Sequence, residues 1–183
     1  GVGAGEVPGL VPMELEAGAG RCGRMRSVTG QTVAKCRVSY HPHETLEMRE
    51  RQLARLEVLQ GACITTFHEF LVEVIPPREL PADETTLAQA LEQIYRAGIF
   101  PDWWKLPPAS SAREWENIAT VIEAHDPHCR GVLVLGLEAS EDRLEQSFRI
   151  AAPHAICRGF AVGRSIFADA AAAWFAGSMN DEA

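Results

Sequence analysis

Short β-type runs alternate with longer helix-type runs from residue 31 onward, and this alternation constrains the fold more than any other feature of the chain. The short runs are rich in β-branched and apolar residues, whereas the longer runs repeat apolar residues at helical spacing. The five pairs, strand first, are TVAKCRVSYHP with ETLEMRERQLARLEVLQGA, HEFLVEVIPP with TTLAQALEQIYRAG, PDWWKL with SAREWENIATVIEAH, GVLVLGLE with EDRLEQSFRIAA, and CRGFAVGRSIF with ADAAAAWFAG. Connections this short predict a parallel sheet covered by helices.

Parallel α/β chains either close into an eight-unit barrel or stay open as a doubly wound sheet. Here polar and special residues follow the strands, in HP, IPP, KLPP, GLEAS and GRSIF. Active sites lie at the carboxyl ends of the strands in both architectures, so the open sheet stays an alternative. Because five β/α units cannot close an eight-stranded barrel, we predict an incomplete barrel of the TIM type.

The domain organisation follows from the point, residue 31, at which the alternation of β-type and helix-type runs begins. Residues 1–30 carry eight of the 15 glycines without periodicity, which is typical of a linker or a poorly ordered segment. We expect residues 31–178 to form the C-terminal part of the barrel and residues 179–183 to be a tail. Three further units would then be missing, or supplied by another segment or a partner chain. An incomplete barrel also exposes a sheet edge that can pair with a second copy of the chain, so a homo-oligomer is a further alternative.

Composition excludes several classes of partner. The net charge of -8, with lysine and arginine thinly spread, argues against a nucleic-acid surface, so an anionic substrate needs a local positive site. Five cysteines without a CxxC pair predict reduced thiols and a cytoplasmic protein rather than a disulfide framework or a zinc ribbon. No apolar run approaches the roughly 20 residues that a membrane helix requires, and no secretory signal is evident.

Lys105 stands in an unusually apolar stretch, FPDWWKLPP. Successive strand residues point to opposite faces, so Trp103 and Lys105 share one face and Trp104 takes the other. If Trp104 packs under the helices, Lys105 points into the barrel, where burial disfavours an ammonium. A neutral amine in that place can attack a carbonyl and form a Schiff base. The alternative is a structural lysine whose ammonium reaches water from the end of a strand.

Glu73 is a carboxylate in the middle of an otherwise apolar strand, FLVEVIPP. Buried acids are rare unless paired, so we expect Glu73 to meet a cation or to carry protons during catalysis. Lys35, near the start of the first strand, and Lys105 are the candidate partners. A purely structural ion pair explains the same pattern equally well.

The turn GFAVGRS, which ends at Ser165, has the composition of a phosphate site. Gly163 allows close approach of the backbone, and Arg164 offers a fork of donors. The helix that follows directs its positive end toward this turn. The loops after the last strands of barrels often bind phosphate in this way, although a lone Gly-Arg pair is a weak pattern. By contrast, His41 with His43 and the HDPHC run lack a third ligand at convincing spacing, so we predict no metal site.

The strand motifs together resemble a known family. VAKCRVSYHP, FLVEVIPP, PDWWKL, RGVLVLGLEAS and GFAVGRSIF, spread over about residues 32–177, resemble the DUF2090 family. This family is the aldolase-type domain joined to the carboxyl side of 5-dehydro-2-deoxygluconokinase in bacterial inositol catabolism. PDWWKL and GFAVGR are the most specific pieces. The domain is similar in turn to tagatose 1,6-bisphosphate aldolase, a class I enzyme on a (β/α)8 barrel.

The resemblance implies a carbon-carbon lyase that cleaves 6-phospho-5-dehydro-2-deoxy-D-gluconate to dihydroxyacetone phosphate and malonate semialdehyde. It implies Lys105 as the Schiff-base lysine, Glu73 as the carboxylate that assists proton transfer, and Lys35 as a further residue of the lumen. Gly163 and Arg164 would hold the substrate phosphate, with no metal or organic cofactor. The resemblance also implies a sugar-kinase domain as a partner in full-length relatives. The alternative is a non-catalytic partial barrel that binds a phosphorylated metabolite or completes a partner chain.

Overall fold

The computed structural model describes residues 2–3, 32–136, 141–162 and 171–178. The strands are β1 (Val2–Gly3), β2 (Val33–Ser39), β3 (Glu69–Ile75), β4 (Trp103–Leu106), β5 (Gly131–Leu135) and β6 (Cys157–Ala161). The helices between them are α2 (Leu46–Thr66), α3 (Thr86–Arg96), α4 (Ala112–His125) and α5 (Glu141–Ala151). Residues 171–175 are also helical. Strand and helix therefore alternate along the described chain as the sequence predicts.

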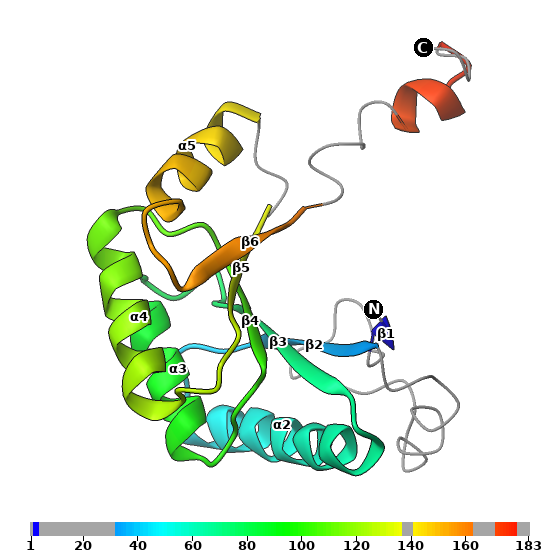
Figure 1. Cartoon of the computed structure of the whole chain (residues 1–183). Coiled ribbons are helices and arrows are strands. Elements are labelled where there is room, and N and C mark those ends of the chain that lie inside the picture. The colour runs from blue at the N-terminus through cyan, green and yellow to red at the C-terminus, as the bar shows by residue number, and fades with distance from the viewer. Residues whose placement is uncertain (1, 4–31, 137–140, 163–170, 179–183) are drawn as a thin grey trace.

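The sheet has the order β1-β2-β3-β4-β5-β6, and every neighbouring pair is parallel. The strands thus follow one another in space as they do in sequence. A doubly wound sheet reverses its strand order at a switch point, and the described strands show no such reversal. Figure 1 shows α2, α3, α4 and α5 following one another along one side of the curved sheet. The architecture is an incomplete parallel α/β barrel, which confirms the predicted fold class.

The two faces of the sheet differ in chemistry. The face turned to the helices is apolar and forms the hydrophobic core with α2, α3 and α4; its strand residues are Ala34, Cys36, Val38, Phe70, Val72, Val74, Trp104, Leu106, Val132 and Val134. Trp104 is fully buried there, and its indole N–H donates a 2.7 Å hydrogen bond to the hydroxyl of Tyr95 on α3. The alternate strand residues therefore point to the other face, which we call the inner face.

Local signals in the sequence explain where two of the helices begin or end. Ser111 caps α4 by accepting a hydrogen bond from the backbone N–H of Glu114 at 3.2 Å. The carboxylate of Glu114 returns to the backbone N–H of Ser110 at 2.7 Å, so the capping box closes one residue earlier than the usual pattern. Gly98, with φ of +80°, follows the end of α3 in a backbone conformation that favours glycine.

Gly131 begins β5 at a position that a larger residue cannot occupy. Its φ is +132°, and an added Cβ would lie 2.7 Å from the backbone oxygen of Ile156 and closer still to the side chain of Arg158. Gly131→Ala is therefore expected to lower the free energy of unfolding by about 2 to 4 kcal/mol, since backbone strain and overpacking add.

Gly61→Ala is the matched control, because Gly61 lies inside α2 with open space around its missing Cβ. That change is expected to raise the free energy of unfolding by up to about 1 kcal/mol. Urea denaturation of both variants measures the pair. Equal stability of the two variants would contradict the packing described at Gly131.

Candidate functional site

Charged side chains gather on the inner face of the sheet, where the strand registers align them. Arg37 on β2 pairs in register with Glu73 on β3, and Glu73 with Lys105 on β4. Lys35 lies two residues before Arg37 on the same face of β2. These four residues therefore occupy three adjacent strands of the central sheet.

Glu73 connects the two lysines directly. The Nζ atoms of Lys35 and Lys105 each lie 3.0 Å from the same carboxylate oxygen, Oε2 of Glu73. The side chain of Glu73 is 6% exposed and that of Lys105 is 14% exposed, whereas that of Lys35 is 41% exposed. Both partners that the sequence suggests for Glu73 thus contact it. Lys105 is the more deeply buried of the two amines, as expected for a strand residue whose neighbour Trp104 packs under the helices.

The lysine count of the chain makes this arrangement informative. The sequence contains 15 arginines and two lysines, and the two lysines are Lys35 and Lys105. A guanidinium stays protonated in proteins, whereas an ammonium can release its proton and become a nucleophile. Where a salt bridge alone is needed, an arginine serves at least as well. Both primary amines of the side chains are therefore concentrated at one carboxylate, in a chain that uses arginine for its other basic positions.

The electrostatics of Glu73 follow from its surroundings. Burial by itself raises the pKa of the Glu73 carboxyl, but the hydrogen bond from Lys105 and the charges of Lys35 and Lys105 outweigh burial. Together they hold this pKa below its ordinary value of 4.5. Glu73 is consequently a carboxylate at neutral pH. It becomes easier to protonate when one of its two ammonium partners loses its charge or moves away.

This lowered pKa predicts a pH-dependent contribution to stability. A carboxyl whose pKa is depressed by folding stabilises the protein fully above its unfolded pKa, and that stabilisation is lost as pH falls through the folded value. The difference in unfolding free energy between wild type and Glu73→Gln should therefore shrink as the pH drops below about 4.5. Urea denaturation between pH 6 and pH 3 measures it. A difference that stays constant over this range would contradict the pairing.

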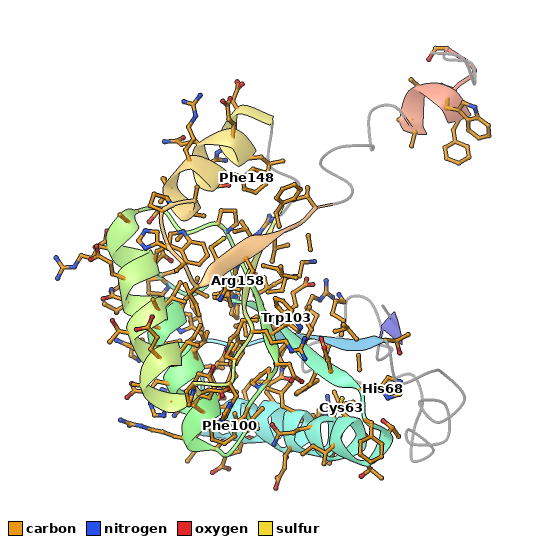
Figure 2. The ribbon with its side chains drawn as sticks, viewed as in Figure 1. Cys63, His68, Phe100, Trp103, Phe148 and Arg158 are labelled. Carbon is orange, nitrogen blue, oxygen red and sulfur yellow. The ribbon has the colours of Figure 1, made fainter. Side chains whose placement is uncertain are left out.

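A second polar network lies one layer toward the amino ends of the strands. The indole N–H of Trp103 donates a 2.8 Å hydrogen bond to Glu69, whose other carboxylate oxygen lies 2.8 Å from a guanidinium nitrogen of Arg130. Figure 2 labels Trp103 near the centre of the sheet. Trp103 precedes Lys105 by two residues on the same face, so this network fixes the strand segment that carries the lysine.

Sequence reasoning missed Arg37 and Glu69 as inner-face residues. The signal was available as the two-residue period of a strand, because Arg37 follows Lys35 by two positions and Glu69 precedes Glu73 by four. Three expected phosphate-binding residues, Gly163, Arg164 and Ser165, lie outside the described residues. Their role stays a prediction.

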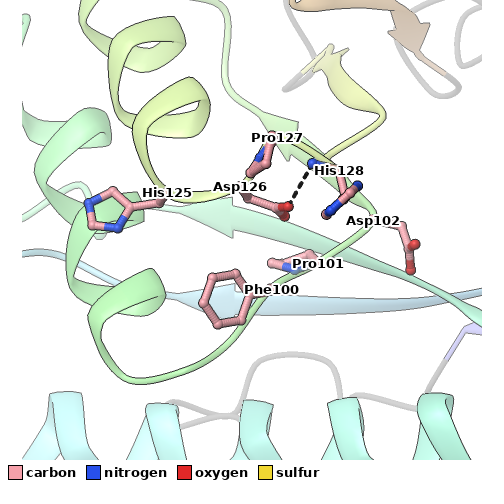
Figure 3. Close-up of a pocket in the computed structure, with 7 residues that line it drawn as sticks. All are labelled: Phe100, Pro101, Asp102, His125, Asp126, Pro127 and His128. Atoms are coloured by element: carbon pink, nitrogen blue, oxygen red, sulfur yellow. Dashed lines mark hydrogen bonds between the residues drawn. The ribbon is translucent and has the colours of Figure 1, made fainter.

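Two cavities among the described residues lie toward the amino ends of the strands, away from the carboxyl ends where barrel enzymes build their active sites. One, of about 310 Å³, is shown in Figure 3 and is lined by Phe100, Pro101, Asp102, His125, Asp126, Pro127 and His128. The other, of about 260 Å³, is lined by Gln60, Cys63, Ile64, His68, Phe70, Phe100 and Asp102. These residues belong to α2, to the end of α4, to the start of β3 or to the segments just before β3, β4 and β5, so neither cavity includes Lys35 or Lys105. The acids and histidines of the first cavity form no cluster suited to a metal ion within the described ranges.

His41 and His43 have structural partners in the loop after β2. The Nε2 atom of His41 lies 3.0 Å from the carbonyl oxygen of Pro81, and its Nδ1 accepts a hydrogen bond from the backbone N–H of His43. His41 is buried, so its ring fastens this loop to the segment before α3.

Within the described part of the chain, no helix combines the length and apolarity that crossing a membrane requires.

The chemistry that the inner-face cluster can perform is that of an amine beside a carboxylate. An ammonium at 3.0 Å from a carboxylate oxygen can transfer a proton to it, and the resulting amine can add to a carbonyl. The second ammonium, Lys35, keeps positive charge next to the same oxygen. The two ammonium groups and the one carboxylate leave the cluster with a net positive charge, which suits an anionic ligand.

Comparison with known proteins places the chain in a family. A solved structure from Corynebacterium glutamicum, the structural-genomics target Cgl0159, shares 17% sequence identity with a TM-score of 0.49, over 80% of this chain and 51% of that one. The chain thus spans about half the length of that structure. No curated protein matches the sequence. A family model described as "Uncharacterized protein conserved in bacteria (DUF2090)" matches residues 3–183. The chain therefore belongs to the DUF2090 family.

Proposed function

We propose that this chain is the Schiff-base domain of a class I aldolase, a carbon-carbon lyase acting on a phosphorylated keto sugar acid. The observation that carries the proposal is the convergence of Lys105 and Lys35, the two lysines of the chain, on one oxygen of Glu73. The burial of Lys105 and its place on the inner face of an incomplete barrel support it, because barrel enzymes build their sites toward the carboxyl ends of the strands.

The substrate that fits best is 6-phospho-5-dehydro-2-deoxy-D-gluconate, which the strand motifs suggest. It supplies a ketone for the amine and two anionic groups for a locally cationic site. Lys105 adds to the ketone at C5, and loss of water gives an iminium. Glu73 accepts the proton of the C3 hydroxyl, the C3–C4 bond breaks, and its electron pair moves into the iminium as an enamine. Malonate semialdehyde leaves at this step.

The cycle closes without a cofactor. Protonation of the enamine at C4 regenerates the iminium, and water then releases dihydroxyacetone phosphate and the free amine of Lys105. The water lost on iminium formation is the water consumed at its hydrolysis, so one substrate gives two products with atoms balanced. Gly163 and Arg164 are proposed to hold the phosphate, which would orient the ketone toward the amine.

Reductive trapping tests the proposal. Borohydride added with dihydroxyacetone phosphate should reduce the iminium and leave a stable mass on the peptide that contains Lys105. Because the chain has one other lysine, peptide mapping distinguishes the two amines unambiguously. An adduct on Lys35 would overturn the assignment of the nucleophile. Absence of any adduct, with phosphate-ligand binding retained, would favour a non-catalytic partial barrel.

A further inference from the structure

The smaller of the two cavities, of about 260 Å³, contains a buried hydrogen-bond acceptor that nothing else in the described chain uses. We propose that this cavity binds a guanidinium group, held between the Nε2 atom of His68 and the carboxylate of Asp102. The cavity lies toward the amino ends of the strands and includes none of the residues of the Schiff-base cycle. The inference is therefore independent of the proposed function.

The hydrogen bonds around His68 fix which ring nitrogen carries the proton. The hydroxyl of Thr66 donates its one proton to the carbonyl oxygen of Ala62 at 2.7 Å. The Nδ1 atom of His68 lies 2.8 Å from the same hydroxyl oxygen, so the Nδ1–H group donates and the oxygen accepts. In the neutral imidazole the lone pair then lies on Nε2, which makes Nε2 a hydrogen-bond acceptor.

This acceptor is buried without a donor. His68 is 8% exposed, and its Nε2 has no hydrogen-bond partner among the described residues. Nδ1 is turned to Thr66, which does not line the cavity, so the part of the ring that remains for the cavity includes Nε2. Figure 2 labels His68 beside Cys63, another lining residue, at the end of α2. Because an unmet buried acceptor is unfavourable, a ligand that supplies an N–H group there gains binding free energy.

Charge favours a cation as this ligand. The lining contains one carboxylate, that of Asp102, and no lysine or arginine. One oxygen of Asp102 accepts the backbone N–H of Phe70 at 2.8 Å, which leaves the other oxygen for a ligand. Figure 3 shows the Asp102 carboxylate pointing away from His125 and Asp126, which line the larger cavity. The carboxyl end of α2 adds partial negative charge just before His68.

A guanidinium fits these surroundings better than an ammonium. Its planar fork carries donors in several directions, so separate N–H groups can reach Asp102 and the Nε2 atom of His68. Its flat faces stack on aromatic rings, and Phe100 lines the cavity while remaining 47% exposed. An alkyl stem can lie against Ile64, which lines the same cavity. The cavity therefore suits either a free alkylguanidine or the side chain of an arginine.

The rim of the cavity distinguishes these two sources. Phe67, which precedes His68, is 86% exposed and has a φ of +56°, a conformation that is rare for a bulky side chain. Ile64 is 68% exposed. A polypeptide that inserts an arginine would cover these two apolar side chains, whereas a free guanidine would reach the cavity without contacting Phe67.

Titration followed by ligand-observed NMR tests the proposal on the protein that carries this chain. The probes are n-propylguanidinium and n-propylurea, which share a planar shape and differ in charge. The first should bind with a Kd on the order of 1 mM, and the second at least about 10-fold more weakly. Asp102→Asn should weaken binding of propylguanidinium about 10- to 100-fold, because it removes the charge but can still accept the N–H of Phe70.

Two further variants locate the ligand in this cavity. His68→Leu should weaken binding of propylguanidinium about 3- to 10-fold, since it removes the acceptor. Its matched control is His128→Leu, because His128 is exposed and lines only the larger cavity. Ile64→Lys changes an exposed helical residue that the fold does not need, and its ammonium should abolish binding by repulsion. The charge control is Glu145→Gln on α5, and both controls should bind as wild type does.

Several results would overturn the proposal. These are propylurea that binds as tightly as propylguanidinium, no saturable binding of either probe at ten times the expected Kd, and unchanged binding in Ile64→Lys. A loss in His128→Leu without a loss in His68→Leu would place the ligand in the larger cavity and would overturn it as well.

A capped tripeptide with leucine on either side of arginine separates the two sources. If a polypeptide is the ligand, the tripeptide should bind about 10-fold more tightly than propylguanidinium, and Phe67→Gly should remove this gain alone. Glycine adopts the backbone conformation of Phe67 without strain, so the variant should fold. A tripeptide that binds no better than propylguanidinium would identify a free guanidine as the ligand.

Discussion

Under the proposed Schiff-base mechanism, Lys105→Met is expected to lower the rate of aldol cleavage by at least about 10⁴-fold. Methionine has nearly the length of lysine but no amine, so the iminium cannot form. The buried strand position should tolerate it, because removal of an ammonium leaves Glu73 still paired with Lys35 at 3.0 Å. Steady-state release of dihydroxyacetone phosphate, followed with a coupled enzyme, measures the loss.

The Lys105→Met result needs a variant that removes an equal charge elsewhere. Arg96→Met serves this purpose, because its guanidinium lies on the surface of α3. That variant should turn over substrate at the wild-type rate. Borohydride adducts should disappear in Lys105→Met and persist in the control. Cleavage by Lys105→Met at a rate near that of wild type would overturn Schiff-base chemistry at this residue.

Glu73→Gln is expected to lower kcat about 10²- to 10⁴-fold, which is the range attributed to a positioned acid or base. Glutamine retains the size of the side chain and can still accept a hydrogen bond from a lysine, but it cannot take up a proton. Its effect should differ in kind from that of Lys105→Met. Iminium formation should continue slowly and still give a borohydride adduct on Lys105, while carbon-carbon cleavage stalls.

Single-turnover measurements separate these two steps in Glu73→Gln. Adduct yield reports iminium formation, and malonate semialdehyde release reports cleavage. Glu145→Gln is the control, because Glu145 is an exposed residue of α5 that pairs with Arg149. A loss of adduct equal to the loss of cleavage would show that Glu73 acts on Lys105 before the bond-breaking step. Full activity of Glu73→Gln would show that Glu73 takes no part in proton transfer and only pairs with the two lysines.

Much of the fold could be read from local patterns, because the physics that sets them is local. Short apolar runs marked the strands β2 to β6. Leu87, Leu91 and Ile94 are spaced for one face of a helix, and they lie on the buried face of α3. Serine is a favoured N-cap residue, and Ser111 caps α4 by accepting a hydrogen bond from the backbone N–H of Glu114. The two-residue strand β1 gave no such signal, because a run that short has no periodicity.

Sequence reasoning named Lys35, Glu73 and Lys105 of the inner-face cluster, but it did not name Arg37 and could not give the contacts between these residues. The unusual placement of Glu73 and Lys105 in apolar strands pointed to both residues, and strand alternation placed Lys105 opposite Trp104. Which cation meets Glu73 depends on the register between strands that are more than 30 residues apart in sequence. Sequence reasoning left Lys35 and Lys105 as alternatives, whereas the structure brings both to one oxygen.

The amino-acid order by itself determined a parallel sheet with an apolar, helix-covered face, since side-chain periodicity and capping act over a few residues. Tertiary structure alone decided that the strands follow one another without a switch point, and that the row Arg37, Glu73 and Lys105 forms on the inner face. The reason is that strand order and register are set by the packing of whole β/α units, and a shift of one residue would turn each of these side chains to the opposite face.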